Sequence, residues 1–220
     1  MDTCYLEMQK ISKAYPGVQA LKNVTISVDS GEVVALLGEN GAGKSTLMNV
    51  LGGIVRRDSG EIRIDGRSAP IRSVSDAKKH GIVFIHQELS LFKQLTVQEN
   101  LFIEAFPKWK GTPFLDRKAM RKKTEQIFCE FGMDIPADAK VSELTMGQQQ
   151  IVEIAGAVLK NAKIIILDEP STSLTARERE KLADIVRKLR DESKAVIYIT
   201  CLLYTSRLFS KNTGLCESES

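Results

Sequence analysis

The sequence predicts an α/β fold with a mainly parallel core sheet, and two observations support this. Short apolar runs recur along the chain, as is typical of strands covered on both faces of a parallel sheet. A helix is predicted between the last two runs, which gives a strand, helix, strand crossover. The runs are EVVALL from Glu32, GIVFIH from Gly81, KIIILDEP from Lys163 and AVIYIT from Ala195.

The crossover helix is predicted from its first residues. Thr175-Ala-Arg-Glu178 matches a capping box, in which the Thr hydroxyl and the Glu carboxylate each accept a hydrogen bond from the other residue's N–H. Apolar residues then follow at helical spacing, at Leu182, Ile185, Val186 and Leu189.

Two other regions differ from the predicted parallel sheet. From Asn23 to Val28, apolar and polar residues alternate, which predicts a half-buried strand in an N-terminal antiparallel β portion. Residues from about 88 to 160 are predicted to form a helical subdomain inside one domain that spans residues 1–200. Its apolar helix positions are Met120, Ile127, Phe128 and Phe131, and then, in a helix from Gln149, Ile151, Ile154, Ala155 and Val158.

The composition is that of a globular protein, with 43% hydrophobic and 27% charged residues among 220. The net charge of +3 is too small to indicate a nucleic-acid partner. The cysteines at positions 4, 129, 201 and 216 lack metal-binding spacing, so free thiols in a reducing compartment such as the cytosol are expected. No apolar run approaches the roughly 18 residues of a membrane span, so a role at a membrane requires partner chains.

A glycine-rich segment directly follows the run EVVALL. Residues 38–46 read GENGAGKST, which matches the phosphate-loop pattern GxxxxGK[ST] between a strand and a helix. Backbone N–H groups in such a loop surround phosphate oxygens, with Lys44 reaching the β- and γ-phosphates and Ser45 binding Mg²⁺. The alternative is an ordinary glycine-rich turn before a helix. The expected ATP contacts are Gly38, Glu39, Asn40, Gly41, Ala42, Gly43, Lys44, Ser45 and Thr46.

An acidic pair ends the apolar run KIIILDEP. Asp168 is expected to hold Mg²⁺ through its water shell, as the metal beside a phosphate loop requires. Glu169 is expected to act as a general base on the attacking water. The alternative, a strand that merely ends at an Asp-Glu-Pro turn, is disfavoured by the phosphate loop earlier in the chain.

Two further motifs complete an ordered set. Gln87 ends the run GIVFIHQ, and LTMGQ at residues 144–148 precedes the predicted helix from Gln149. In this order the motifs resemble the nucleotide-binding domain of ABC transporters over about residues 4–200. GENGAGKST is similar to Walker A, Gln87 to the Q-loop, LTMGQ to the LSGGQ-type signature, IIILDE to Walker B and Ser173-Leu-Thr175 to the D-loop. The resemblance implies a P-loop NTPase fold with a helical ABC subdomain.

The resemblance also implies a site that is shared by two domains facing each other head to tail. Each ATP is then held between the Walker A loop of one domain and the signature of the other. Thr145 replaces the usual serine and keeps its hydroxyl, and Gly147 allows a close approach to the γ-phosphate. The implied signature contacts are Leu144, Thr145, Met146, Gly147 and Gln148.

The same resemblance implies roles for two single residues, Tyr15 and Gln87. Tyr15 is similar to the A-loop aromatic that stacks on adenine, the alternative being a core aromatic beside a turn. Gln87 would contact the Mg²⁺ ion or the attacking water and respond to transport subunits, the alternative being a polar residue that ends a strand. Glu169, Gln87 and Lys44 form the implied catalytic set.

Longer stretches such as IHQELSLFKQLTVQEN resemble the first half of duplicated ATPases that drive bacterial import of sugars of the ribose, galactose and xylose kind. The resemblance implies a peripheral ATPase on the cytoplasmic face of the plasma membrane. Its implied partners are membrane permease subunits, a second ATPase half or copy and, indirectly, a periplasmic or extracellular sugar-binding protein. Thr175 replaces the general D-loop Asp, as in that subgroup. The alternatives are a soluble ABC protein that acts on ribosomes or DNA and a hydrolysis-deficient nucleotide-binding module.

The resemblance stops after AVIYIT, so the chain is expected to be an incomplete fragment. Cys201 stands where the family has a switch histidine, and a thiol is a weak hydrogen-bond donor. CLLYTS can be encoded by TGT CTC TTA TAC ACA TCT, the transposon end used to prepare sequencing libraries. Our hypothesis is that residues 201–220 are wholly or partly an assembly artefact, the alternative being a natural divergent tail on a degenerate ATPase. We expect the chain to bind nucleotide but to hydrolyse it poorly.

Overall fold

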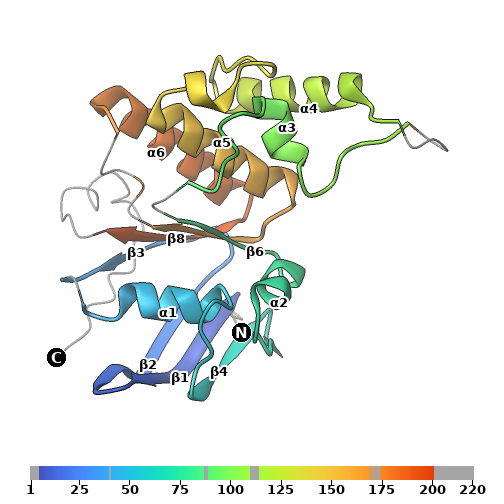
Figure 1. The fold of residues 1–220 in the computed structure, drawn as a ribbon. Helices are drawn as coiled ribbons and strands as arrows, with labels where there is room; N and C mark the ends of the chain where they lie inside the picture. Colours follow the sequence, from blue (N-terminus) through green and yellow to red (C-terminus); the bar gives the residue numbers. More distant parts are fainter. Residues whose placement is uncertain are drawn as a thin grey trace. The chain divides into compact units, whose positions relative to one another are not determined.

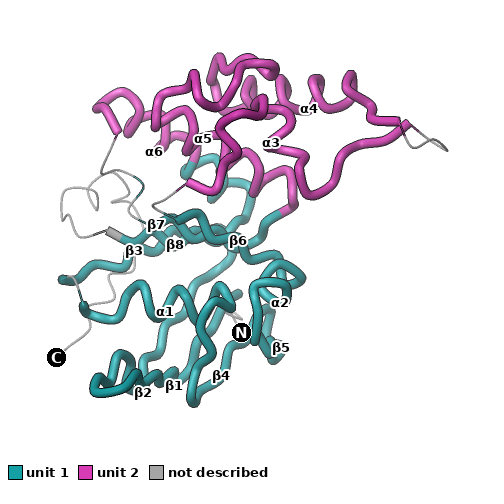
Figure 2. Tube along the Cα trace, viewed as in Figure 1, with its two compact units in different colours: residues 1–87, 162–171, 186–220 teal, residues 88–161, 172–185 magenta. Residues whose placement is uncertain are grey.

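The fold is that of a computed structural model, which describes residues 5–39, 41–86, 89–109, 114–168, 170 and 174–200. The chain forms two compact units (Figure 2). The first consists of residues 1–87, 162–171 and 186–220, and the second of residues 88–161 and 172–185. Asn40, Gln87, Glu169, Ser173 and the tail from Cys201 lie outside the described residues.

The first unit contains the predicted parallel sheet, in the strand order β3-β8-β7-β6. Each predicted apolar run forms one of its strands, since side chains on both faces of such a strand are covered. The strands are β3 (Val33–Leu37), β6 (Ile82–Ile85), β7 (Ile164–Asp168) and β8 (Ala195–Thr200).

An antiparallel sheet in the order β2-β1-β4-β5 completes the strands of the first unit. Its strands are β1 (Leu6–Tyr15), β2 (Val18–Val28), β4 (Ser59–Ile64) and β5 (Arg67–Ser68). The strand predicted from Asn23 begins earlier, at Val18, because β1 and β2 form one long hairpin whose register shifts near Lys13. Asn23 itself has a positive φ of 51°, and the predicted alternation follows it, with Val24, Ile26 and Val28 on the covered side of the strand.

Helix α1 (Lys44–Leu51) lies between the two sheets (Figure 1). Its buried side chains join those of both sheets in one apolar core, which fixes the start of α1 relative to the end of β3. Core members include Met8, Ile62, Val34, Met48, Leu51, Ile166 and Ile197. Helix α2 (Val74–Lys79) belongs to the same unit and is capped by the Ser73 side chain.

The second unit is helical. It contains α3 (Val97–Phe102), α4 (Arg117–Glu130), a 3-10 turn at Val141–Glu143 and α5 (Met146–Leu159). It also holds the first part, up to Ile185, of α6 (Ala176–Asp191). No helix among the described residues is long and apolar enough to cross a membrane.

Two predicted helix starts have different outcomes. The capping box before α6 is confirmed, because Glu178 N–H donates to the Thr175 hydroxyl and Thr175 N–H donates to the Glu178 carboxylate. The predicted start at Gln149 is wrong, since α5 begins at Met146. Thr145 and Gln148 form a capping box of their own, so the signature residues Met146, Gly147 and Gln148 lie in the first turn of the helix.

Candidate functional site

The glycine-rich segment at residues 38–46 joins β3 to α1 in the first unit. Gly43 is the N-cap of α1 and has a left-handed φ of 84°. A Cβ at this position would lie 2.6 Å from the Ala20 carbonyl oxygen and 2.9 Å from the Leu21 side chain. Only glycine allows the loop to turn this closely against β2.

The start of α1 has no side-chain cap and no acidic residue in its first turn. By contrast, α2, α3, α4 and α5 are each capped by a polar side chain. The first backbone N–H groups of α1 therefore have no side-chain acceptor at the positive end of the helix dipole. This arrangement suits an anionic oxygen ligand.

Lys44 curls back over the loop that precedes it. Its Nζ donates to the carbonyl oxygens of Gly38 at 2.6 Å and Glu39 at 2.8 Å. A hollow opens beside this lysine between the β1–β2 hairpin and the end of β8. It is lined by Val18, Gln19, Ala20, Gly41, Gly43, Lys44, Ser45, Thr46 and Ile199.

Asp168 ends β7 at the same edge of the sheet at which β3 leads into the loop. Asp168 is in register with Ile199 of β8, and Leu37 of β3 is in register with Thr200. One strand therefore separates Asp168 from the end of β3, and two strand spacings amount to about 10 Å. A metal ion with its water shell fits a separation of this size between Asp168 and a loop that holds phosphates.

Tyr15 ends β1, where it is in register with Val18 across the hairpin turn. Its side chain is 41% exposed, and Lys13 Nζ lies 5.7 Å from the ring centroid. The alternative of a core aromatic is therefore wrong, because a core ring would be covered. An exposed ring on this hairpin has a face on which another planar group can stack.

The residues LTMGQ lie in the second unit at the start of α5. Thr145 is exposed and Met146 is 51% exposed, whereas Gly147 is buried. Thr145 Oγ1 donates to Glu178 Oε1 at 2.7 Å. No local sequence pattern indicates this contact, because the two residues are 33 positions apart.

Residues 21–172 match the sequence profile of the ABC transporter family. The chain belongs to that family. It is 47% identical over 196 residues to the arabinose import ATP-binding protein AraG of Rhizobium meliloti, and the aligned region covers 89% of this chain and 38% of that protein. It is 44% identical over 198 residues to the ribose import ATP-binding protein RbsA of Clostridium perfringens, and the aligned region covers 90% of this chain and 40% of that protein. The chain thus spans about two fifths of the length of these curated relatives.

Solved ABC structures confirm the predicted P-loop NTPase fold. A nucleotide-free ATP-binding cassette from an ABC transporter matches with a TM-score of 0.81 and 27% identity, over 93% of this chain and 84% of that one. A dimeric cassette bound to ADP and phosphate matches with a TM-score of 0.75 and 28% identity, over 92% of this chain and 90% of that one. Domains of this ABC family therefore bind nucleotide.

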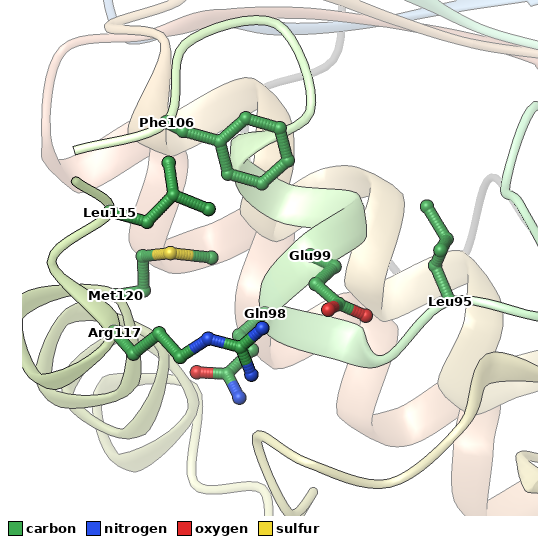
Figure 3. A pocket seen from close by; sticks show the side chains of 7 residues that line it. All are labelled: Leu95, Gln98, Glu99, Phe106, Leu115, Arg117 and Met120. Atoms are coloured by element: carbon green, nitrogen blue, oxygen red, sulfur yellow. The ribbon is translucent and has the colours of Figure 1, made fainter. Parts of the chain in front are cut away.

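Another hollow of the ABC domain lies within the second unit (Figure 3). Phe106, Leu115 and Met120 give it an apolar side, while Arg117, Gln98 and Glu99 are polar. The seventh lining residue is Leu95. No residue expected to contact ATP lines this hollow.

Glu153 is a half-buried glutamate on α5 that belongs to none of the motifs described above. Burial raises its pKa to about 7, although it accepts a hydrogen bond from Ser90 N–H. The available signal was its position inside the otherwise apolar run IVEIA. A charged residue at such a position is rarely buried without a partner.

Proposed function

We propose that the chain binds MgATP at the loop between β3 and α1. The observation that carries this proposal is the uncapped start of α1, at which Gly43 has no room for a side chain and Lys44 lies over the loop. The N–H groups of this segment would bind the β- and γ-phosphates, and Lys44 would exchange its carbonyl partners for phosphate oxygens. Tyr15 would stack on the adenine.

The donors near the loop suit Mg²⁺, which prefers hard oxygen ligands and keeps several waters. Ser45 offers a hydroxyl and Asp168 a carboxylate. Gln87, which lies outside the described residues, would add an amide oxygen. Within the described residues, no cluster of His, Cys, Asp and Glu could hold a metal alone. A metal shared with the phosphates, as these dispersed donors require, neutralises charge on the transferred group when bound.

Hydrolysis is proposed to need two copies of the domain. The exposed Thr145 and, two residues further on, Gly147 would contact the γ-phosphate of ATP held by the other copy. Glu169 would take a proton from the attacking water, and Gln87 would orient that water. Support comes from the likeness to cassettes that were solved as dimers.

We further propose that the ATPase energises import of a monosaccharide. The relatives named for arabinose and ribose import support this assignment. The partners would be membrane permease subunits at the cytoplasmic face, a second ATPase half or copy and, indirectly, a sugar-binding protein. Sequencing of the genomic locus across codon 200 tests it: a reading frame that continues into a second ATPase half, beside permease genes, is expected. A natural stop after Ser220 with no such neighbours would contradict it.

Thermal unfolding with different nucleotides tests the binding site. Because the loop is proposed to bind the β- and γ-phosphates, MgATP should stabilise the chain and MgAMP should not. A ligand at about 100 times its Kd adds about 2.7 kcal/mol, which corresponds to a rise in Tm of about 5 °C or more. Equal stabilisation by MgATP and MgAMP would contradict phosphate binding at this loop.

A further inference from the structure

Glu178 connects the start of α6 to the signature residues at the start of α5. Its Oε2 accepts hydrogen bonds from Thr175 N–H at 2.9 Å and from the Thr175 hydroxyl at 2.8 Å. Its Oε1 accepts the hydroxyl proton of Thr145 at 2.7 Å. A hydroxyl has one proton to donate, so Thr145 gives it to Glu178 in this conformation.

The contact with Thr145 is not needed for capping. In the second unit, Glu99 makes the same capping box at the start of α3, accepting from Thr96 N–H at 2.9 Å and from the Thr96 hydroxyl at 2.8 Å. Glu178 therefore has a cap of ordinary geometry plus a bond to a second helix. The additional bond requires an explanation other than the stability of α6.

The carboxylate of Glu178 also lies directly against Gly147. A Cβ on Gly147 would lie 2.5 Å from both Cδ and Oε1 of Glu178. Hydrogen bonds from Thr175 N–H and from the Thr145 hydroxyl lower the pKa of Glu178, so it is an anion at neutral pH. The Glu178 carboxylate therefore accepts the Thr145 hydroxyl proton and lies against Gly147, at the positive end of the α5 dipole.

We propose that Glu178 is a gating carboxylate for the signature: the γ-phosphate of a second copy's ATP must replace it as the acceptor of the Thr145 hydroxyl before two domains close on ATP. This inference rests on the proposed head-to-tail dimer. The carboxylate and the triphosphate are both negative, so they compete for one hydroxyl proton and repel each other at close range. Glu178 is a positioning residue in this scheme, since it acts through Thr145.

The variant Glu178→Gln separates gating from capping. Glutamine is also a capping-box residue, because its amide oxygen can accept from Thr175 N–H. Its amide NH₂ can donate to the Thr145 oxygen, which leaves the hydroxyl proton free for phosphate. The matched control is Glu99→Gln, which makes the same change in a capping box that does not contact Thr145.

The measurement is the ATP concentration that gives half-maximal dimer in sedimentation velocity, with Glu169→Gln in every chain to keep ATP intact. We expect Glu178→Gln to lower this concentration about tenfold, as removal of one like charge at a partly exposed contact allows. Glu99→Gln should leave it unchanged. Equal values for the two variants would overturn the gating role, as would a loss of Tm in Glu178→Gln with no change in dimerisation.

Binding of MgATP to the monomer, measured in parallel, distinguishes a failure of the gating role from a failure of the proposed function. If the chains bind MgATP and dimerise but Glu178→Gln behaves like its control, the gating role alone is wrong. If they bind MgATP and none dimerises, the proposed shared site is wrong and the gate falls with it. If none binds MgATP, the proposed function itself is contradicted, and so is the inference.

Discussion

The phosphate loop depends on Gly43 having no side chain, and Gly43→Ala tests this dependence. The new Cβ would lie 2.6 Å from the Ala20 carbonyl oxygen, and an ordinary contact begins at 3.4 Å, so the two must separate by about 0.8 Å. Overpacking of this kind costs about 1–3 kcal/mol. The positive φ of 84° adds about 1–2 kcal/mol for a residue with a Cβ.

We therefore expect Gly43→Ala to lower the free energy of unfolding by about 3 kcal/mol, and to weaken MgATP binding because the displaced residue starts the helix that holds the phosphates. The control is Gly66→Ala, which has a similar φ of 69° but nothing within 4 Å of the new Cβ, and should lose only about 1 kcal/mol. Urea unfolding and calorimetric titration with MgATP measure both effects. Equal losses in the two variants, with unchanged MgATP affinity, would refute the steric argument.

Three more outcomes are expected. Because burial raises the pKa of Glu153 to about 7 from 4.5, the folded chain keeps a proton that the unfolded chain releases. Its contribution to stability is complete below about pH 4.5 and is lost as pH rises through about 7, so Glu153→Gln should remove up to about 3 kcal/mol of pH dependence in urea unfolding. An unchanged pH profile would show that Glu153 does not titrate in this range. Asp168→Asn should raise the Mg²⁺ concentration needed for ATP binding about tenfold, since it removes a negative charge beside the metal; an unaltered Mg²⁺ titration would exclude Asp168 from the site. Cys201→His should increase phosphate release from ATP and the control Cys129→His should not, and equal rates would contradict a switch role for position 201.

The parallel strands were predictable because β3, β7 and β8 are buried on both faces and β6 is buried or half-buried along its length, so that all four appear as uninterrupted apolar runs. Strand β1 was not located from its pattern. Leu6 and Met8 alternate as expected, but Lys10 has a positive φ of 51° and the register shifts before Ile11. The buried positions consequently lose their period of two, and the pattern no longer indicates a strand.

The phosphate loop and the signature residues also differ in how much of their structure the sequence predicts. The phosphate loop is contiguous in sequence, so its glycines, Lys44 and Ser45 could be identified from spacing alone. The contact of Glu178 with Thr145 joins two helices 33 residues apart, and no local pattern encodes it. The local pattern identifies Glu178 as the capping partner of Thr175, but it does not show that the same carboxylate also accepts a hydrogen bond from Thr145.

Calorimetric titration of the 220-residue chain with MgATP, beside Lys44→Ala, tests most directly whether residues 38–46 form an ATP site. The control is Lys79→Ala, which removes an equal charge from a side chain that is 75% exposed on α2. The wild-type chain and Lys79→Ala should bind MgATP alike, and Lys44→Ala should bind at least about tenfold more weakly, as loss of a charged phosphate contact predicts. Identical isotherms for all three chains would contradict the proposed site.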